Sequence, residues 1–315
     1  MKIVILAAGL GKRMKSKTPK VLHPILGKPL IRYVTDLAYS LSPEKVVVVV
    51  SNDGSAIKRA VPQKKTVYVV QEPPRGSGDA AMKGLAPIGR GKVLILSGDA
   101  PCLKKTSVDR LVRHHHRQRS DLTVVCAELE DPQAYGRVII GAGGQIRRIV
   151  EHTDATPEQK KVRLINGGIY LADAEVLKQA LARLKPDNKQ GEYYLTDAVR
   201  IIISRGGRVF PFIVDDPNEV LGVNSKQELA EMRRLIRASF YGELMTAGVL
   251  IEDADSTTID VGVVFGQEVV VKPNTVIEGK SRIGDNCEIG PFAWVKNYAV
   301  RKGSRVAFKK LVKEA

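Results

Sequence analysis

Short apolar runs alternate with amphipathic segments along roughly the first 223 residues. The runs are rich in Val, Ile and Leu, and they have the length of strands that are buried on both faces of a sheet. They cover residues 3–6, 45–50, 67–70, 93–96 and 122–125. The segments between them carry apolar residues at helical spacing, as over 30–39, 79–85 and 108–117. This alternation predicts an α/β fold with a mostly parallel Rossmann-like sheet and helices on both of its faces.

Beyond this region the apolar pattern changes twice. Residues 225 to about 245 repeat apolar positions at three- and four-residue steps, which predicts an amphipathic linking helix. The period then becomes six, with apolar residues at 259, 265, 271, 277, 283, 289 and 295. Such a period predicts a short left-handed parallel β-helix of about two to three coils, and it is interrupted at Arg301. We therefore predict a domain over 1–224, a linking helix over 225–248, and a β-helix with a basic tail over 249–315.

The chain is strongly basic, with 50 Lys and Arg against 34 Asp and Glu and a formal net charge of +16. Nucleic-acid binding would explain this charge, but the basic residues are spread along the chain and only 5% of the residues are aromatic. A basic cleft for a phosphorylated ligand explains the charge as well, and we expect no nucleic-acid partner.

The cysteines and the apolar runs bear on the cellular compartment. The three cysteines lie far apart and form no metal-binding motif. No apolar run reaches the ~18 residues of a membrane span, and no secretory signal is visible. We therefore expect a reduced, cytoplasmic protein without a membrane partner.

The first predicted strand leads into a loop of small residues. Glycine and alanine let backbone N–H groups approach an anionic ligand closely. Arg13 and Lys20 bring two cations to the same end of the strand. The loop lacks the hydroxyl residue that follows the lysine of a P-loop, and position 14 is Met where a dinucleotide fingerprint needs a third glycine. The pattern predicts a nucleoside triphosphate site at Leu6, Ala7, Ala8, Gly9 and Gly11.

Two further polar residues are candidates for a metal site. Asp99 follows a predicted strand, so we expect its carboxylate at the carboxyl edge of the sheet, where ligands of such sheets bind. Mg²⁺ takes one or two protein oxygens together with phosphates and water, and Asn224 would supply the second oxygen. Asn224 would serve equally as the N-cap of the linking helix. The consecutive His114, His115 and His116 point in different directions on a helix, which favours a basic helix surface over a metal site.

The pattern Leu-Ala-Ala-Gly-x-Gly-x-Arg-Met over 6–14, followed by Pro19-Lys20, resembles the signature of nucleotide-sugar pyrophosphorylases. The continuation over 20–29 is most similar to the uridylyltransferase half of bacterial N-acetylglucosamine-1-phosphate uridyltransferases. The resemblance extends to about residue 300. It supports the predicted α/β domain followed by a β-helix.

This resemblance also implies roles for individual residues. Arg13 and Lys20 would be catalytic, and Asp99 and Asn224 would hold Mg²⁺. The segment 71–78 resembles the part that reads uracil in this family, although a Ser77 hydroxyl would alternatively cap a helix. The implied nucleotide contacts in this segment are Gln71, Gly76 and Ser77. The implied sugar-binding residues are Gly136, Glu151, Asn166, Tyr194 and Thr196. Taken alone, Glu151 would be a solvated surface charge.

The activity that the resemblance implies is transfer of UMP from UTP to N-acetylglucosamine 1-phosphate. The products would be UDP-N-acetylglucosamine, a cell-wall precursor, and pyrophosphate, and the β-helix would assemble the chain into a homotrimer. Alternatives are the same chemistry on glucose 1-phosphate or another sugar 1-phosphate, with UTP or dTTP, and a non-catalytic scaffold. Bifunctional relatives also acetylate glucosamine 1-phosphate, using residues in later coils of a longer β-helix. The sequence stops before those coils, so we expect no acetyltransferase activity.

Overall fold

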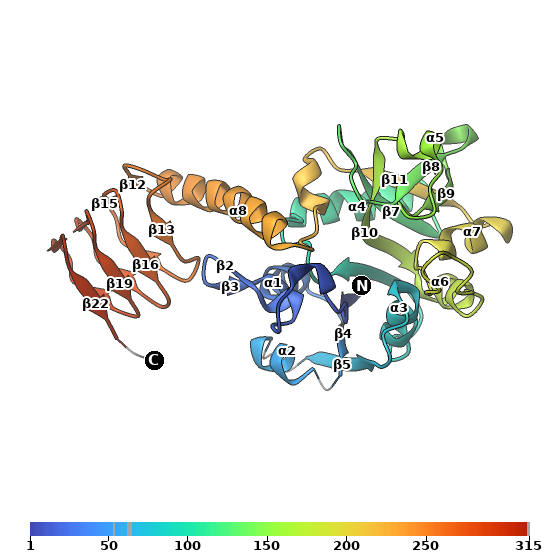
Figure 1. Cartoon of the computed structure of the whole chain (residues 1–315), viewed down its shortest axis with the longest axis horizontal. Helices are drawn as coiled ribbons and strands as arrows, with labels where there is room; N and C mark the ends of the chain where they lie inside the picture. Colours follow the sequence, from blue (N-terminus) through green and yellow to red (C-terminus); the bar gives the residue numbers. More distant parts are fainter. Residues whose placement is uncertain (53, 62–64, 314–315) are drawn as a thin grey trace. The chain divides into compact units, whose positions relative to one another are not determined.

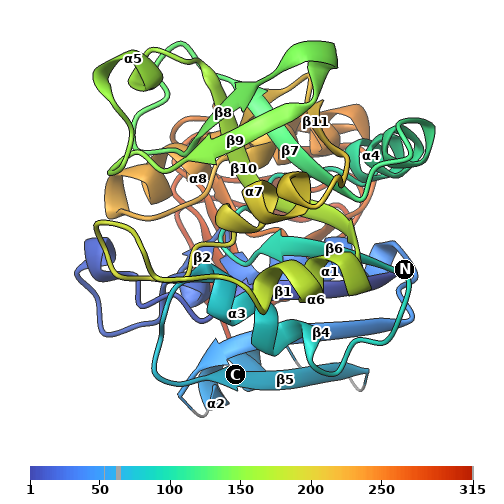
Figure 2. The same cartoon turned by 90° about the vertical axis from the view of Figure 1, so that its right-hand side faces the viewer.

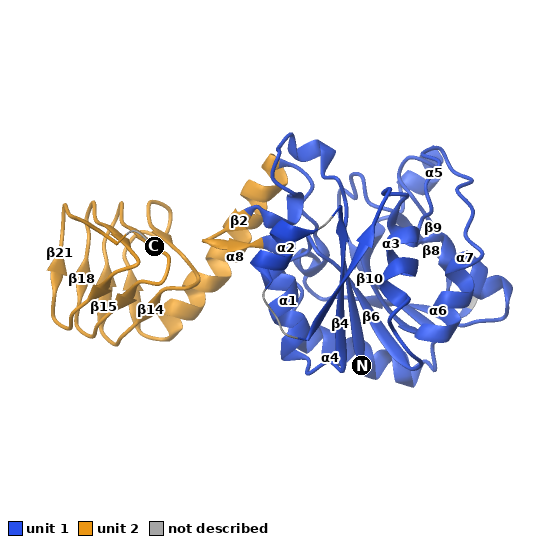
Figure 3. Ribbon diagram, turned by 90° about the horizontal axis from the view of Figure 1, so that it is seen from below, with its two compact units in different colours: residues 1–23, 30–225 blue, residues 24–29, 226–315 orange. Residues whose placement is uncertain are grey.

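The computed structural model describes residues 1–52, 54–61 and 65–313. The chain divides into two compact units (Figure 3). Unit 1 comprises residues 1–23 and 30–225, and unit 2 comprises residues 24–29 and 226–315. Figure 1 labels the helices and strands. No helix within the described residues is long and apolar enough to span a membrane.

Unit 1 is built on a mixed, mostly parallel sheet. Its main path consists of β11 (Val209–Ile213), β7 (Leu122–Glu128), β10 (Leu164–Asp173), β6 (Lys92–Ser97), β1 (Lys2–Ala7), β4 (Lys45–Ser51) and β5 (Thr66–Gln71), in this order. Strand β10 runs antiparallel to both of its neighbours, and the other pairs on this path are parallel. A hairpin of β8 (Arg137–Ile140) and β9 (Ile146–Val150) is attached to β10. The predicted α/β sheet is therefore confirmed, with one antiparallel strand inserted into it.

Helices cover both faces of this sheet. One apolar cluster contains residues of α3 (Ser77–Leu85), α6 (Ala174–Leu181) and α7 (Asp197–Ser204), which lie in front of the sheet in Figure 2. The other cluster contains residues of α1 (Leu30–Ser40), α2 (Ser55–Ala60) and α4 (Lys105–Arg117). The alternation of a strand explains this division, because Val4 of β1 belongs to the first cluster and Ile3 and Ile5 belong to the second. The shorter helical segments are α5 (Pro157–Lys160), η1 (Lys12–Met14), η2 (Lys20–Leu22), η3 (Ala142–Gly144) and η4 (Pro217–Val220).

Unit 2 contains α8 (Lys226–Thr246) and a three-sided parallel β-helix. The first side consists of β12 (Val249–Ile251), β15 (Val269–Val271), β18 (Glu288–Ile289) and β21 (Arg305–Val306). The second side consists of β13 (Thr258–Ile259), β16 (Val276–Glu278), β19 (Trp294–Lys296) and β22 (Lys310–Val312). The third side consists of β14 (Val264–Phe265), β17 (Arg282–Ile283) and β20 (Ala299–Val300). The predicted six-residue repeat thus forms a β-helix.

The coils of this β-helix shorten along the chain. Paired strands are 18 residues apart at first, as with Thr258 and Val276. The separation is 17 residues between Arg282 and Ala299, and 16 residues between Trp294 and Lys310. The interruption of the period at Arg301 is this shortening, and buried Val300 and Val306 continue the core. The prediction of two to three coils was therefore too low, and most of the basic tail belongs to the β-helix.

The division into units also differs from the predicted boundaries at residues 24–29. These residues form a hairpin of β2 (Pro24–Ile25) and β3 (Lys28–Pro29), and they belong to unit 2. The carbonyl of Leu26 accepts a hydrogen bond of 3.1 Å from the Val261 amide. Gly27 has φ +74°, and a Cβ there would lie 2.4 Å from a carboxylate oxygen of Asp260. Glycine is needed at this position for both its conformation and the space.

Candidate functional site

A cavity of about 790 Å³ lies at the carboxyl ends of β1, β5 and β6 in unit 1. These strands run in the same direction, so residues at their ends gather at one edge of the sheet. The cavity is lined by all of the residues predicted to contact nucleotide or metal or to be catalytic. They are Leu6, Ala7, Ala8, Gly9, Gly11, Arg13, Lys20, Gln71, Gly76, Ser77, Asp99 and Asn224.

The loop after β1 is held open by one buried side chain and one glycine. Met14 is 1% exposed, and its amide donates to the carbonyl of Gly11 at 2.9 Å. Gly11 has φ +58°, and a Cβ there would lie 2.8 Å from Cβ of Lys20. The missing side chain therefore allows Lys20 to approach the loop. Arg13 is exposed at the cavity wall.

Lys20, Asp99 and Asn224 meet inside this cavity. The Lys20 ammonium pairs with Oδ2 of Asp99 and donates to Oδ1 of Asn224 at 2.8 Å. The Ser97 hydroxyl donates to the other oxygen of Asp99 at 2.5 Å. Burial by itself would raise the pKa of Asp99, but the Lys20 charge and these hydrogen bonds lower the pKa below its usual value. Asp99 is therefore ionised at neutral pH.

The geometry around Lys20 tests whether the site fits a metal ion. The ammonium is a stand-in cation, since it contacts one carboxylate oxygen and one amide oxygen that converge on it. This donor set suits Mg²⁺, which completes its shell with phosphate oxygens and water. Among the described residues, no group of three or more His, Cys, Asp and Glu could hold a metal without such help. A metal at Asp99 and Asn224 would therefore depend on a phosphorylated ligand.

The segment 71–78 forms a second wall. The Gln71 side-chain amide donates to the carbonyl of Gly76 at 2.9 Å and to Oδ2 of buried Asp79 at 2.8 Å, which fixes its orientation. Helix α3 begins at Ser77, and its N-cap position is Gly76 without a side-chain cap. The Ser77 hydroxyl instead accepts a hydrogen bond of 3.1 Å from the Leu195 amide. Capping by Ser77, the alternative considered from the sequence, is therefore not observed.

The predicted sugar-binding residues are divided between the cavity and its support. Glu151, Asn166 and Thr196 line the cavity. The Thr196 hydroxyl donates to Oε1 of Glu151 at 2.8 Å, and burial raises the pKa of the Glu151 carboxyl. Gly136 and Tyr194 are not among the lining residues. Gly136 lies behind Glu151, where a Cβ would come within 3.3 Å of Oε2.

The structure also brings residues to the cavity that sequence reasoning missed. Ser97 and Tyr170 lie at its wall, as do Gln190 and Glu192. Ser97 could have been found, because it ends the strand that precedes Asp99. The segment around Gln190 has no strand or helix pattern that would have indicated its position.

The three histidines do not form the predicted surface as a group. His116 is exposed, but His115 is only 1% exposed and its Nδ1 lies 2.8 Å from the Thr123 hydroxyl. Burial lowers the pKa of His115 to about 4. The prediction of a basic helix surface was therefore wrong for His115, which lies on the face of α4 that packs against β7.

Comparisons with known proteins agree with this arrangement. The model of the MobA-like NTP transferase domain matches residues 3–195, and that of the bacterial transferase hexapeptide (six repeats) matches residues 262–297. The bifunctional protein GlmU of Caldanaerobacter subterraneus subsp. tengcongensis is 40% identical over 307 residues, which cover 97% of this chain and 66% of that protein. GlmU of Halalkalibacterium halodurans is 35% identical over 311 residues, which cover 98% of this chain and 68% of that protein. The chain belongs to the GlmU family.

The chain spans about two thirds of the length of these GlmU relatives. The NTP transferase match includes the cavity residues from Leu6 to Glu192, whereas Thr196 and Asn224 lie beyond its last residue. The crystal structure of a UDP-glucose pyrophosphorylase complexed with UDP-glucose has a TM-score of 0.62 at 21% identity. This likeness covers 76% of this chain and 98% of that one, and it extends the agreement to the fold.

Proposed function

We propose that the chain transfers UMP from UTP to N-acetylglucosamine 1-phosphate, with Mg²⁺ as cofactor. The observation that carries the proposal is the convergence of Lys20, Asp99 and Asn224 beside a glycine-rich loop. A cation that is already held by a carboxylate and an amide oxygen marks a place where charge on phosphates can be neutralised. Membership of the GlmU family supports the choice of UTP and N-acetylglucosamine 1-phosphate.

The chemistry needs no general base. A phosphate oxygen of the sugar 1-phosphate attacks the α-phosphorus of UTP in line, a P–O bond to that phosphorus forms, and the bond to pyrophosphate breaks. Since the attacking oxygen is already anionic, positioning and neutralisation of charge account for catalysis. The Lys20 ammonium would bind the α-phosphate region, and the exposed Arg13 would bind the leaving pyrophosphate. Mg²⁺ held by Asp99 and Asn224 would supply charge neutralisation between the phosphates.

The other walls would orient the two substrates. The fixed Gln71 amide is suited to the edge of a pyrimidine, because it presents donor and acceptor groups. Glu151 uses Oε1 to accept from Thr196, and Oε2 lies beside the backbone of Gly136. We assign Oε2 to a sugar hydroxyl, and Asn166 to the same substrate. Gly136 and Tyr194 would support this wall from behind.

A panel of nucleotides and sugar phosphates tests the proposal. The intact chain is incubated with each of UTP, dTTP, CTP, ATP and GTP against the 1-phosphates of N-acetylglucosamine, glucose and galactose, with Mg²⁺ or with EDTA. We expect pyrophosphate release with UTP and N-acetylglucosamine 1-phosphate, and its loss in EDTA. Fastest release with dTTP or with glucose 1-phosphate would replace the substrate named here. Release with no sugar 1-phosphate at any divalent ion would refute nucleotidyl transfer and favour a scaffold.

We also propose that the β-helix assembles the chain into a homotrimer. Its surface exposes large apolar side chains, including Phe292 at 58% and Phe308 at 74%. Their rings are stacked with centroids 5.6 Å apart. Apolar surface of this kind is typical of a face that is covered by another subunit.

A further inference from the structure

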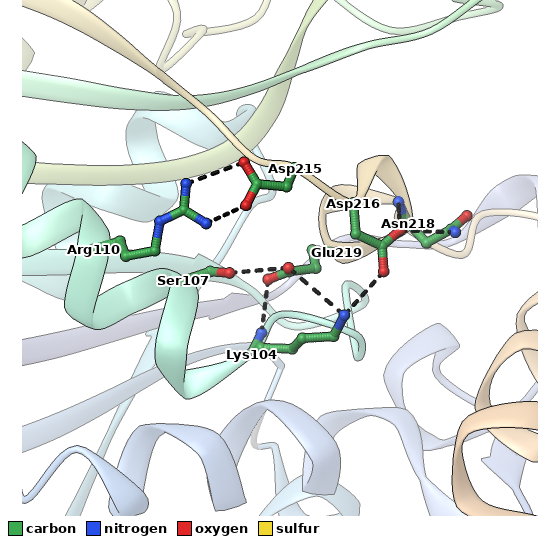
Figure 4. Close-up of polar contacts among 7 residues, drawn as sticks. All are labelled: Lys104, Ser107, Arg110, Asp215, Asp216, Asn218 and Glu219. Carbon is green, nitrogen blue, oxygen red and sulfur yellow. Dashed lines mark hydrogen bonds and ion pairs between the residues drawn. The ribbon is translucent and has the colours of Figure 1, made fainter. Parts of the chain in front are cut away.

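A buried carboxylate outside the cavity joins the two segments that carry Asp99 and Asn224. Glu219 is 3% exposed and is not among the cavity-lining residues (Figure 4). Its Oε2 accepts from the backbone amide of Lys104 at 3.0 Å, and its Oε1 accepts from the Ser107 hydroxyl at 2.9 Å. The Lys104 ammonium lies 3.9 Å from the same carboxylate. Glu219 therefore binds the beginning of α4 through both of its oxygens.

The positions of these partners along the chain are the reason why the contact matters. Lys104 follows Asp99 by five residues, and Glu219 precedes Asn224 by the same number. Near the cavity the two segments meet again, where the Val223 amide donates to the carbonyl of Asp99 at 3.0 Å. The Glu219 contacts thus close a short frame whose other side is the pair of residues that hold the Lys20 ammonium.

A second connection between the same segments is exposed and serves as a comparison. Arg110 of α4 and Asp215 form an ion pair whose side chains are 43% and 74% exposed (Figure 4). Exposed pairs contribute little, because water screens them and ordering two long side chains costs entropy. A buried carboxylate must keep its hydrogen bonds, since an unsatisfied buried charge is strongly unfavourable. The position of the Asn224 segment therefore depends on Glu219 far more than on Asp215.

We propose that Glu219 is a positioning residue for the metal site: it fixes the Asn224 segment to the start of α4, so that Asp99 and Asn224 present their oxygens to the same cation. The proposal rests on the proposed function, because that function assigns the metal to these two residues. Residues that orient metal ligands without touching the metal typically change its affinity by roughly 10–100-fold when they are altered. Glu219 differs from a purely structural carboxylate in this specific effect on the metal.

The test measures nucleotide binding by isothermal titration calorimetry, without turnover. The metal advantage is defined as the ratio of the UTP dissociation constant in EDTA to that in saturating Mg²⁺. For Glu219→Gln we expect this ratio to fall about tenfold, with UTP binding in EDTA within twofold of the unaltered chain. Ser107→Ala should lower the ratio by less, and the double variant should be non-additive, because both changes remove the same contact. Asp215→Asn is the matched control, and it should leave the ratio unchanged.

Thermal unfolding of each variant separates positioning from loss of fold. A lower melting temperature for Glu219→Gln with an unchanged metal advantage would overturn the proposal, and so would an equal effect of Asp215→Asn. If Glu219→Gln does not fold, Ser107→Ala decides, since it removes one of the same hydrogen bonds without burying a new charge. A metal advantage in the unaltered chain without pyrophosphate release would refute the proposed transfer while leaving the Glu219 test intact. No metal advantage in the unaltered chain would overturn the role of Glu219 itself.

Discussion

At the scale of single residues, Lys20 occupies the place where the proposed metal would bind. Its ammonium contacts the oxygens of Asp99 and Asn224 that would hold Mg²⁺. A divalent cation must therefore displace Lys20, and a bound phosphate offers the displaced ammonium a new partner. Metal and nucleotide should thus favour each other's binding through one lysine.

Replacing Lys20 by Ala tests this competition. We expect turnover to fall by roughly 10²–10³, because one charged contact to the reacting phosphates is lost. In the absence of nucleotide, Mn²⁺ should bind the variant more tightly than the unaltered chain, since the ammonium no longer competes for Asp99. Calorimetry with Mn²⁺ and pyrophosphate release measure the two effects. Lys17→Ala removes the same charge from an exposed position nearby and is the control. Unchanged Mn²⁺ affinity in Lys20→Ala would contradict the competition.

The sequence was sufficient to predict which residues would meet, and insufficient to predict how they pair. Asp99, Gln71 and the loop after β1 converge because parallel strands bring their carboxyl ends to one edge. The pairing of Lys20 with Asp99 depends on side-chain directions within the folded cavity, which no local pattern encodes. Glu219 was missed for the same reason, since its partners lie more than 100 residues away.

At the scale of secondary-structure elements, α4 and β7 are joined by a neutral histidine. His115 packs with Nδ1 on Thr123 and has a pKa lowered to about 4 by burial. In the unfolded chain a histidine has its ordinary pKa near 6.5. Between these values the unfolded state binds a proton that the folded state does not. The free energy of unfolding therefore decreases as the pH falls through this range.

This linkage predicts a loss of stability in acid that His115 controls. The contribution has a slope of at most about 1.4 kcal/mol per pH unit between pH 6.5 and 4. Urea unfolding at pH 7 and pH 5 should give a smaller difference for His115→Gln than for the unaltered chain. His116→Gln alters an exposed neighbour and should preserve the difference. An identical pH dependence in His115→Gln and the unaltered chain would show that His115 is not the titrating group.

The elements themselves were predictable where the apolar period is regular. The strands of unit 1 and the coils up to Val295 follow periods that each specify one geometry. The shortened coils were not predictable, because removing one residue per coil shifts Val300 and Val306 out of the six-residue register while keeping them in the core. The burial of His115 was missed because a run of three histidines gives no apolar pattern that indicates the face of α4.

At the scale of the whole molecule, the proposed trimer is tested by removing the β-helix and retaining α8. Light scattering of the intact chain should give three times its mass of 34.4 kDa. Deleting residues 249–315 should give a monomer, because the exposed Phe292 and Phe308 are removed with the β-helix. The UMP-transfer site lies entirely within residues of unit 1, so pyrophosphate release should persist. An unchanged number of subunits after the deletion would place the contact elsewhere.

The hairpin at residues 24–29 has a consequence for any such cut. Because it belongs to unit 2, the backbone passes between the units after residues 23, 29 and 225, and a single break at the start of α8 does not separate them. Ile25 and Leu26 are 0% and 2% exposed, so loss of their partners in unit 2 would expose them to solvent. Lys28 in the same hairpin would then become a cleavage site for trypsin, eight residues from Lys20. The rate of tryptic cleavage at Lys28 therefore reports the integrity of the β-helix unit from a position inside the nucleotide-binding sequence.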